Sequence, residues 1–127
     1  MEVIATDHAP HAAAEKARPM ETAPFGIVGL ETAAALTISN LVRPGILTMV
    51  QMAQKMSYNP ARLLGLANKG MIREGAAADL VVLDADAAWT VDPRGFASKG
   101  KNTPFGGQKL YGKVMATIAD GCIAYRA

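Results

Sequence analysis

Residues 2–11 read Glu-Val-Ile-Ala-Thr-Asp-His-Ala-Pro-His, and the architecture can be worked out from this stretch outward. The three apolar residues after Glu2 are continuous and do not alternate with polar ones, which predicts a short buried strand over residues 2–6. Residues 7–26 hold three prolines, which neither a regular ladder nor a helix interior tolerates. We therefore expect a long loop there, and loops of this length in compact domains are usually functional or disordered.

Beyond the loop, apolar residues recur at the spacing of a helix. They predict a helix from Gly29 to about Leu41, which the Arg43-Pro44-Gly45 turn ends. The same period predicts a second helix over residues 46–56. Asn59-Pro60 then fits an N-cap and a first-turn proline, so a short third helix is expected over residues 61–64.

After residue 65 the helical period gives way to short apolar runs separated by glycines. Asp120-Gly121 is a strong hairpin signal between two such runs. We expect strands over residues 79–84, 89–91, 113–119 and 122–125. The sequence thus predicts two parts, a strand with its loop and helices in residues 1–65 and a small antiparallel β module in residues 66–127.

Composition places the chain in the globular class and limits its partners. With 127 residues, 50% hydrophobic, it has about the length of one domain and falls short of the roughly 250 residues of a complete (β/α)₈ barrel. A formal charge of +2 is too weak to imply nucleic acid or a membrane surface. The sequence shows no secretion signal, so we expect a cytoplasmic protein. Cys122, the one cysteine, excludes an internal disulfide and is expected to be an inert strand residue.

Asp7, His8 and His11 are the residues most able to carry chemistry. An aspartate at the carboxyl end of a strand lies where parallel-barrel enzymes project catalytic groups. Together with two imidazoles it could bind zinc or share acid–base work. The same composition also fits an aspartate that caps a turn beside two exposed histidines. Pro10 stiffens the backbone between the donors, which makes a self-sufficient metal site improbable.

The sequence around these residues closely resembles the end of the barrel in bacterial dihydroorotases, members of the amidohydrolase superfamily. The resemblance lies in residues 4–11 and 24–31 and continues through residues 58–61, 69–70, 75, 78–84, 98–105 and the terminal hairpin. It implies an α/β fold, in which the last strand-helix units of an incomplete (β/α)₈ barrel precede a small antiparallel β module. His11 favours dihydroorotases over allantoinases and hydantoinases, which usually lack a histidine at this place.

The resemblance also implies roles for single residues. Asp7 matches a residue of the family's binuclear zinc site that shuttles a proton during reversible cyclisation of N-carbamoyl-aspartate to dihydroorotate. His11 is expected to hold the substrate carboxylate, and the backbone of Phe25 and Gly26 to contact the pyrimidine ring. Glycine at this place would permit a close approach. The resemblance gives no role to His8.

The chain departs from the family in lacking the other metal ligands, because it has no histidine beyond His11. We therefore expect the C-terminal portion of a dihydroorotase, inactive by itself and not binding zinc alone. Two alternatives stay open. One is a non-catalytic dihydroorotase-like subunit that scaffolds a transcarbamoylase, and the other is a hydantoinase or allantoinase relative. A homo-oligomer is also a candidate assembly, since an isolated piece of a barrel would leave apolar faces uncovered.

Overall fold

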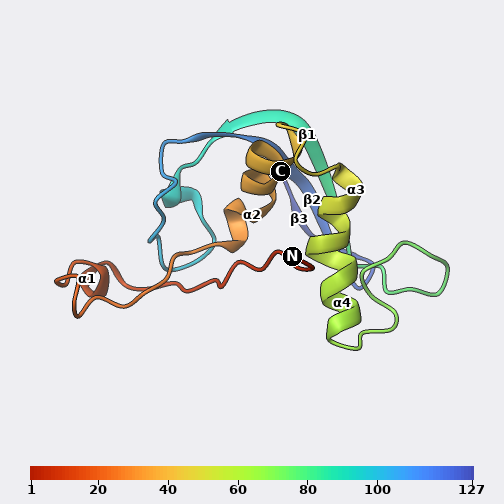
Figure 1. Ribbon diagram of the computed structural model, residues 1–127, viewed down its shortest axis with the longest axis horizontal. Helices are drawn as coiled ribbons and strands as arrows, with labels where there is room; N and C mark the ends of the chain where they lie inside the picture. The colour runs from red at the N-terminus through yellow and green to blue at the C-terminus, as the bar shows by residue number, and fades with distance from the viewer.

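The computed structural model describes residues 1–127. One long helical segment packs on a three-stranded sheet and a second one contacts the first, and the loop that carries α1 projects on the side opposite the loop between α4 and β1 (Figure 1). None of the helices has the length and apolar character needed to cross a membrane. The elements are α1 (Ala13–Lys16), α2 (Leu30–Thr37), η1 (Ile38–Val42), α3 (Met49–Ala53), η2 (Gln54–Tyr58), α4 (Asn59–Leu63), β1 (Leu80–Thr90), η3 (Pro93–Gly95), β2 (Lys109–Ala119) and β3 (Cys122–Arg126).

The strand expected over residues 2–6 is wrong for this chain. The segment joins no ladder, and the one parallel bridge nearby pairs His8 with Ile27. The amide of Ile4 donates instead to the carbonyl of Lys55, at 3.0 Å. A parallel strand needs a neighbour to complete its backbone hydrogen bonds, and the three strands of this chain pair only with one another. The structure therefore consists of helices and one three-stranded antiparallel sheet, with no closed barrel.

The loop over residues 7–26 contains one helical turn that the sequence reading did not predict, α1. The Glu15 carboxylate accepts a hydrogen bond from the backbone amide of Ala12, at 2.9 Å, and so stabilises the start of this turn. The rest of the segment has no helix or strand.

The helix expected from Gly29 to Leu41 is confirmed. α2 runs without a break into η1, whose wider π turn ends at Val42. The amide of Arg43 donates to the carbonyl of Ile38, five residues back, immediately before Pro44.

The expected separation of the second and third helices at Asn59 is wrong. α3, η2 and α4 form one continuous helix, and Tyr58 and Asn59 both have helical backbone angles. A π turn again precedes the proline, because the Asn59 amide donates to the carbonyl of Gln54. In a regular α-helix the ring of Pro60 would clash with the carbonyl four residues back, so the wider turn lets the helix pass through the proline.

The antiparallel β module is confirmed, with the strand order β1-β2-β3. The expected strands over residues 79–84 and 89–91 are one strand, β1, interrupted by a bulge between Asp84 and Ala88. The Asp84 carboxylate accepts hydrogen bonds from the amides of Asp86 and Ala87, each at 3.0 Å, and so supplies the bulge with local partners. β2 begins earlier than expected, at Lys109.

The hairpin predicted at Asp120-Gly121 is also confirmed. Both residues have positive φ, 49° and 76°, as a two-residue type I′ turn requires. Cys122 follows the turn as the first residue of β3, and its side chain is free and exposed.

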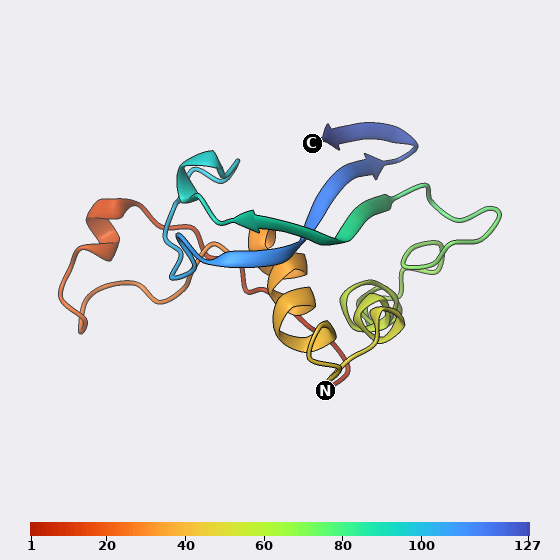
Figure 2. The same ribbon diagram turned by 90° about the horizontal axis from the view of Figure 1, so that it is seen from above.

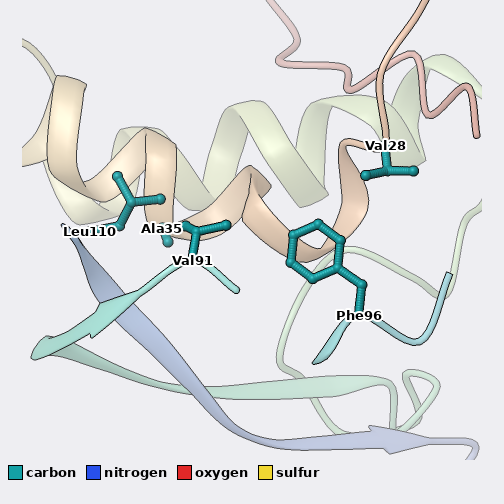
Figure 3. Packing of buried hydrophobic residues seen from close by; sticks show 5 residues of the cluster. All are labelled: Val28, Ala35, Val91, Phe96 and Leu110. Carbon is teal, nitrogen blue, oxygen red and sulfur yellow. The ribbon is translucent and has the colours of Figure 1, made fainter. Parts of the chain in front are cut away.

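The core lies between α2 and the part of the sheet where β1 ends and β2 begins. Seen from above, the two long helical segments occupy the same side of the sheet (Figure 2). The side chains of the cluster converge between α2 and the strands (Figure 3). The cluster consists of Val28, Ala35, Val91, Phe96 and Leu110.

This core is small for the length of the chain. Only 13 of 127 residues are buried, so most apolar side chains keep some contact with solvent. Among the most exposed are Leu63, Leu64 and Ile72, at 78%, 72% and 91%. The cluster takes residues from both sides of the boundary proposed at residue 65, so the two parts share one core. That boundary stays a prediction.

Candidate functional site

Asp7 presents an unpaired carboxylate at the start of the loop. Its side chain is exposed and makes no hydrogen bond or ion pair within the chain. Its φ of 44° is left-handed, a conformation shared among non-glycine residues only by Asp120. The turn explains Asp120, whereas Asp7 lies in no regular turn. Aspartate tolerates this conformation better than most residues do, and such backbone outliers gather at functional sites.

His8 caps a helix, a role that the sequence analysis missed. Its Nδ1 atom accepts hydrogen bonds from the amides of Gly29 and Leu30, at 3.1 and 3.4 Å. These amides lie at the start of α2, where backbone donors have no partner inside the helix. Nδ1 therefore holds a lone pair and the ring proton is on Nε2. The capped amides are some twenty residues away in sequence, so no local pattern signals this contact.

The structure brings His11 together with Phe25 and Gly26. The Nε2 atom of His11 donates to the carbonyl of Phe25 at 2.9 Å. Its Nδ1 atom faces the Glu15 carboxylate at 3.8 Å. The two arms of the loop also join through the amide of Ala9, which donates to the carbonyl of Ile27 at 2.8 Å. Three of the four predicted site residues thus form one cluster.

Gly26 is required by its own surroundings. Its φ is 114°, and a Cβ atom there would lie 2.4 Å from the Cβ of Ala9. A larger residue would push the two arms of the loop apart. The neighbouring Phe25 ring points into solvent, 90% exposed, so only its backbone takes part in the cluster.

Asn102 is the second residue that the sequence analysis missed. Its side chain accepts a hydrogen bond from the amide of His11 and donates to the carbonyls of Ala9 and Gly26. The loop that carries it is held by Glu31, whose carboxylate accepts from the amides of Ala97 and Ser98 at 2.8 and 3.1 Å. The nearest sequence signal is the position of Asn102 in a short polar stretch between Gly100 and Pro104, and this position by itself does not indicate its partners.

The shifted pKa values of the chain belong to two exposed ion pairs of the β module. A hydrogen bond from Lys69 lowers the pKa of Asp79, and the same contact raises the pKa of Lys69. A hydrogen bond from Arg94 likewise lowers the pKa of Asp92 and raises that of Arg94. The first pair closes the loop before β1, because Asp79 directly precedes the strand, and both pairs are structural.

The donors in this chain do not fit a complete metal site. No group of three or more His, Cys, Asp or Glu side chains is placed to hold a metal ion. Nδ1 of His8 and Nε2 of His11 are both engaged with the backbone, whereas the carboxylate of Asp7 has no partner in the chain. A catalytic zinc site uses about three protein ligands. Asp7 could supply one of them.

Comparison with known proteins matches the whole chain to one family. The sequence pattern of the Amidohydrolase family matches residues 3–124. The dihydroorotase of Clostridioides difficile is 53% identical over 127 residues, which are 100% of this chain and 30% of that protein. The dihydroorotase of Clostridium acetobutylicum is 50% identical over 125 residues, 98% of this chain and 29% of that protein.

The solved structures agree with this match. The D-hydantoinase (dihydropyrimidinase) of a Thermus species superposes with a TM-score of 0.90 at 27% identity, covering 99% of this chain and 28% of that protein. The chain spans about 30% of the length of the curated relatives it matches. Since the family pattern covers nearly all of its residues, the chain belongs to the amidohydrolase family.

Proposed function

We propose that this chain supplies one wall of the active site of a dihydroorotase, within a longer polypeptide. The reaction is the reversible cyclisation of N-carbamoyl-aspartate to dihydroorotate, a step of pyrimidine biosynthesis. Support comes from the 53% identity to a dihydroorotase over the whole chain. The observation that carries the proposal is the placement of His11 against the Phe25–Gly26 backbone, at the end of the segment that Asp7 opens.

Asp7 is the proposed catalytic residue. Its carboxylate has no partner in the chain, so it is free to accept a proton from an attacking group and return it to a departing ring nitrogen. The same carboxylate is the one ligand that this chain would give to a zinc site. The donors present in this chain do not complete such a site.

His11, Phe25 and Gly26 are the proposed substrate-binding residues. Since Nε2 of His11 already donates to the carbonyl of Phe25, Nδ1 is the nitrogen left to face a substrate carboxylate, to which it donates when the ring is protonated. The Glu15 carboxylate already lies 3.8 Å from that nitrogen, so a substrate carboxylate would take its place there. The proposed partner is therefore a small dicarboxylic or cyclic amide substrate. A cytoplasmic location and a homo-oligomeric or transcarbamoylase-bound assembly stay predictions.

A substrate panel tests the proposal. The complete polypeptide that carries this sequence, purified with zinc, should turn over dihydroorotate and form it from N-carbamoyl-aspartate. Turnover of hydantoin or dihydrouracil without dihydroorotate would favour the hydantoinase alternative, to which the fold is also similar. No turnover of any cyclic amide by a folded, metal-loaded protein would support the scaffold alternative and refute the proposal.

A further inference from the structure

Asn102 joins both arms of the candidate site through one side chain. Its Oδ1 atom accepts a hydrogen bond from the amide of His11, at 2.9 Å. Its Nδ2 atom donates to the carbonyls of Ala9 and Gly26, at 3.0 and 3.1 Å. The carbonyl of Asn102 itself accepts from the amide of Val28, at 3.0 Å. Four backbone groups from two separate segments are thus bound by one residue.

The neighbouring Gly100 shows that this approach is built into the loop. Gly100 is buried, and a Cβ atom there would lie 2.7 Å from the Cβ of Pro10 and 2.9 Å from the amide nitrogen of His11. Any larger residue would move the loop away from His11. The close packing at Gly100 and the hydrogen bonds of Asn102 therefore serve the same contact.

The amide group of asparagine suits this position better than its closest replacements. The site presents one backbone donor and two backbone carbonyls, so the side chain must accept on one atom and donate twice from the other. Aspartate would keep the bond from His11 but would set a negative charge against the carbonyls of Ala9 and Gly26. Alanine would leave all three backbone groups without this partner.

We propose that Asn102 is a positioning residue that acts through His11. By fixing the separation of the two arms, it holds the His11 ring and the Phe25–Gly26 backbone in the arrangement that binds the substrate carboxylate. This inference rests on the proposed function for its substrate and on the geometry for the contact. Asn102 itself touches neither the substrate nor the reacting atoms in this assignment.

The first test measures catalysis in the complete, zinc-loaded polypeptide. Asn102→Ala should raise KM for dihydroorotate, with a loss of kcat/KM of about ten- to a hundredfold, because a displaced binding group costs this much. Asn102→Asp should lose as much or more. A purely structural role would lower the folded, active fraction, and therefore kcat, at unchanged KM. In a His11→Ala background, Asn102→Ala should cost much less, since both changes remove one function.

Asn40→Ala is the matched control. Asn40 also donates from Nδ2 to a backbone carbonyl, that of Leu36 at 3.0 Å, but it lies on the exposed side of η1 outside the site. This variant should keep the KM of the original protein. An Asn102→Ala enzyme whose KM equals that of Asn40→Ala would overturn the inference.

The second test does not depend on activity. Hydrogen exchange should show the His11 amide protected in the original protein and exchanging at least tenfold faster in Asn102→Ala, while the Asn40→Ala protein matches the original. Unchanged exchange in Asn102→Ala would overturn the positioning contact. If the original protein turns over no dihydroorotate, the proposed function fails, whereas the exchange result still decides whether Asn102 holds His11.

Discussion

Asp7 combines an unpaired carboxylate with a left-handed backbone, a pair of features that only Asp120, in the hairpin turn, shares. Its carboxylate is unpaired, whereas Asp79, Asp86 and Asp92 all form ion pairs. Its backbone is left-handed, which costs a non-glycine residue about 1 kcal/mol. The next residue, His8, pairs with Ile27 and accepts a hydrogen bond from the amide of Gly29. These contacts can hold the conformation of Asp7 in place. A strained residue with a free functional group is the pattern expected where chemistry selects the backbone shape.

Replacing Asp7 by asparagine tests its catalytic role. In the complete polypeptide, Asp7→Asn should lower turnover of dihydroorotate by orders of magnitude, because an amide cannot take up the proton. Folding should be largely intact, since asparagine tolerates the same left-handed backbone. Asp120→Asn is the matched control, as Asp120 has a φ of 49° in a hairpin turn. Near-normal turnover of Asp7→Asn would remove Asp7 from the mechanism.

Replacing His8 by alanine tests the cap of α2. The amides of Gly29 and Leu30 lose their acceptor, so the first turn should become less stable by about 1 kcal/mol, as other lost caps do. Hydrogen exchange at these two amides should quicken about fivefold. The Gln51 amide, which the Thr48 hydroxyl caps in α3, is the internal reference and should not change. If the Gly29 and Leu30 amides exchanged no faster in His8→Ala than in the original protein, the capping role would be contradicted.

At the scale of the elements, the features that depend on patterns within one segment were predicted correctly, whereas contacts between distant segments were not predicted. The helix from residue 29 and the Asp120-Gly121 hairpin follow from apolar spacing and turn chemistry, which are local. The strand over residues 2–6 failed because its apolar run signals burial without supplying a partner strand. Asn59-Pro60 reads as a helix start, yet a π turn carries one helix through it. His8 and Asn102 were missed because their partners lie far away in sequence.

The packing of η1 on β2 depends on a missing side chain at Gly112. A Cβ atom there would lie 2.5 Å from Cδ1 of Ile38, which is 1% exposed. Gly112→Ala should therefore destabilise the protein by about 2 to 4 kcal/mol, from overpacking plus the strain of its positive φ. Gly107→Ala isolates the strain alone, because Gly107 has a φ of 79° and open space around it. It should cost about 1 kcal/mol.

Urea unfolding of the complete polypeptide compares the two glycine variants. The difference between them reports the clash with Ile38, provided that both keep the same m-value. A second substitution, Ile38→Val, removes the clashing Cδ1 and should recover part of the stability lost in Gly112→Ala. Equal destabilisation by Gly112→Ala and Gly107→Ala would show that the helix and the sheet do not pack here as described.

For the molecule as a whole, the small core and the incomplete donor set have one explanation. Large apolar side chains on α4, in the loop after it and on the sheet are exposed, among them Leu63, Ile72 and Ile123. A folded chain that stays monomeric rarely leaves this much apolar surface uncovered. The same chain places no group of three potential metal ligands together, whereas a catalytic zinc site needs about three. Both features agree with the 30% share of the dihydroorotases that the chain spans.

The isolated 127-residue chain should therefore behave differently from the complete polypeptide in two measurements. At stoichiometric zinc it should show no turnover of dihydroorotate, because Asp7 alone cannot hold the metal. In light scattering it should associate as its concentration rises, since association is the available way to cover its apolar faces. The complete polypeptide, assayed alongside, should be active. Zinc-dependent turnover by the isolated chain would contradict the view that its site is incomplete, and a monomer at all concentrations would show that its exposed apolar surface needs no cover.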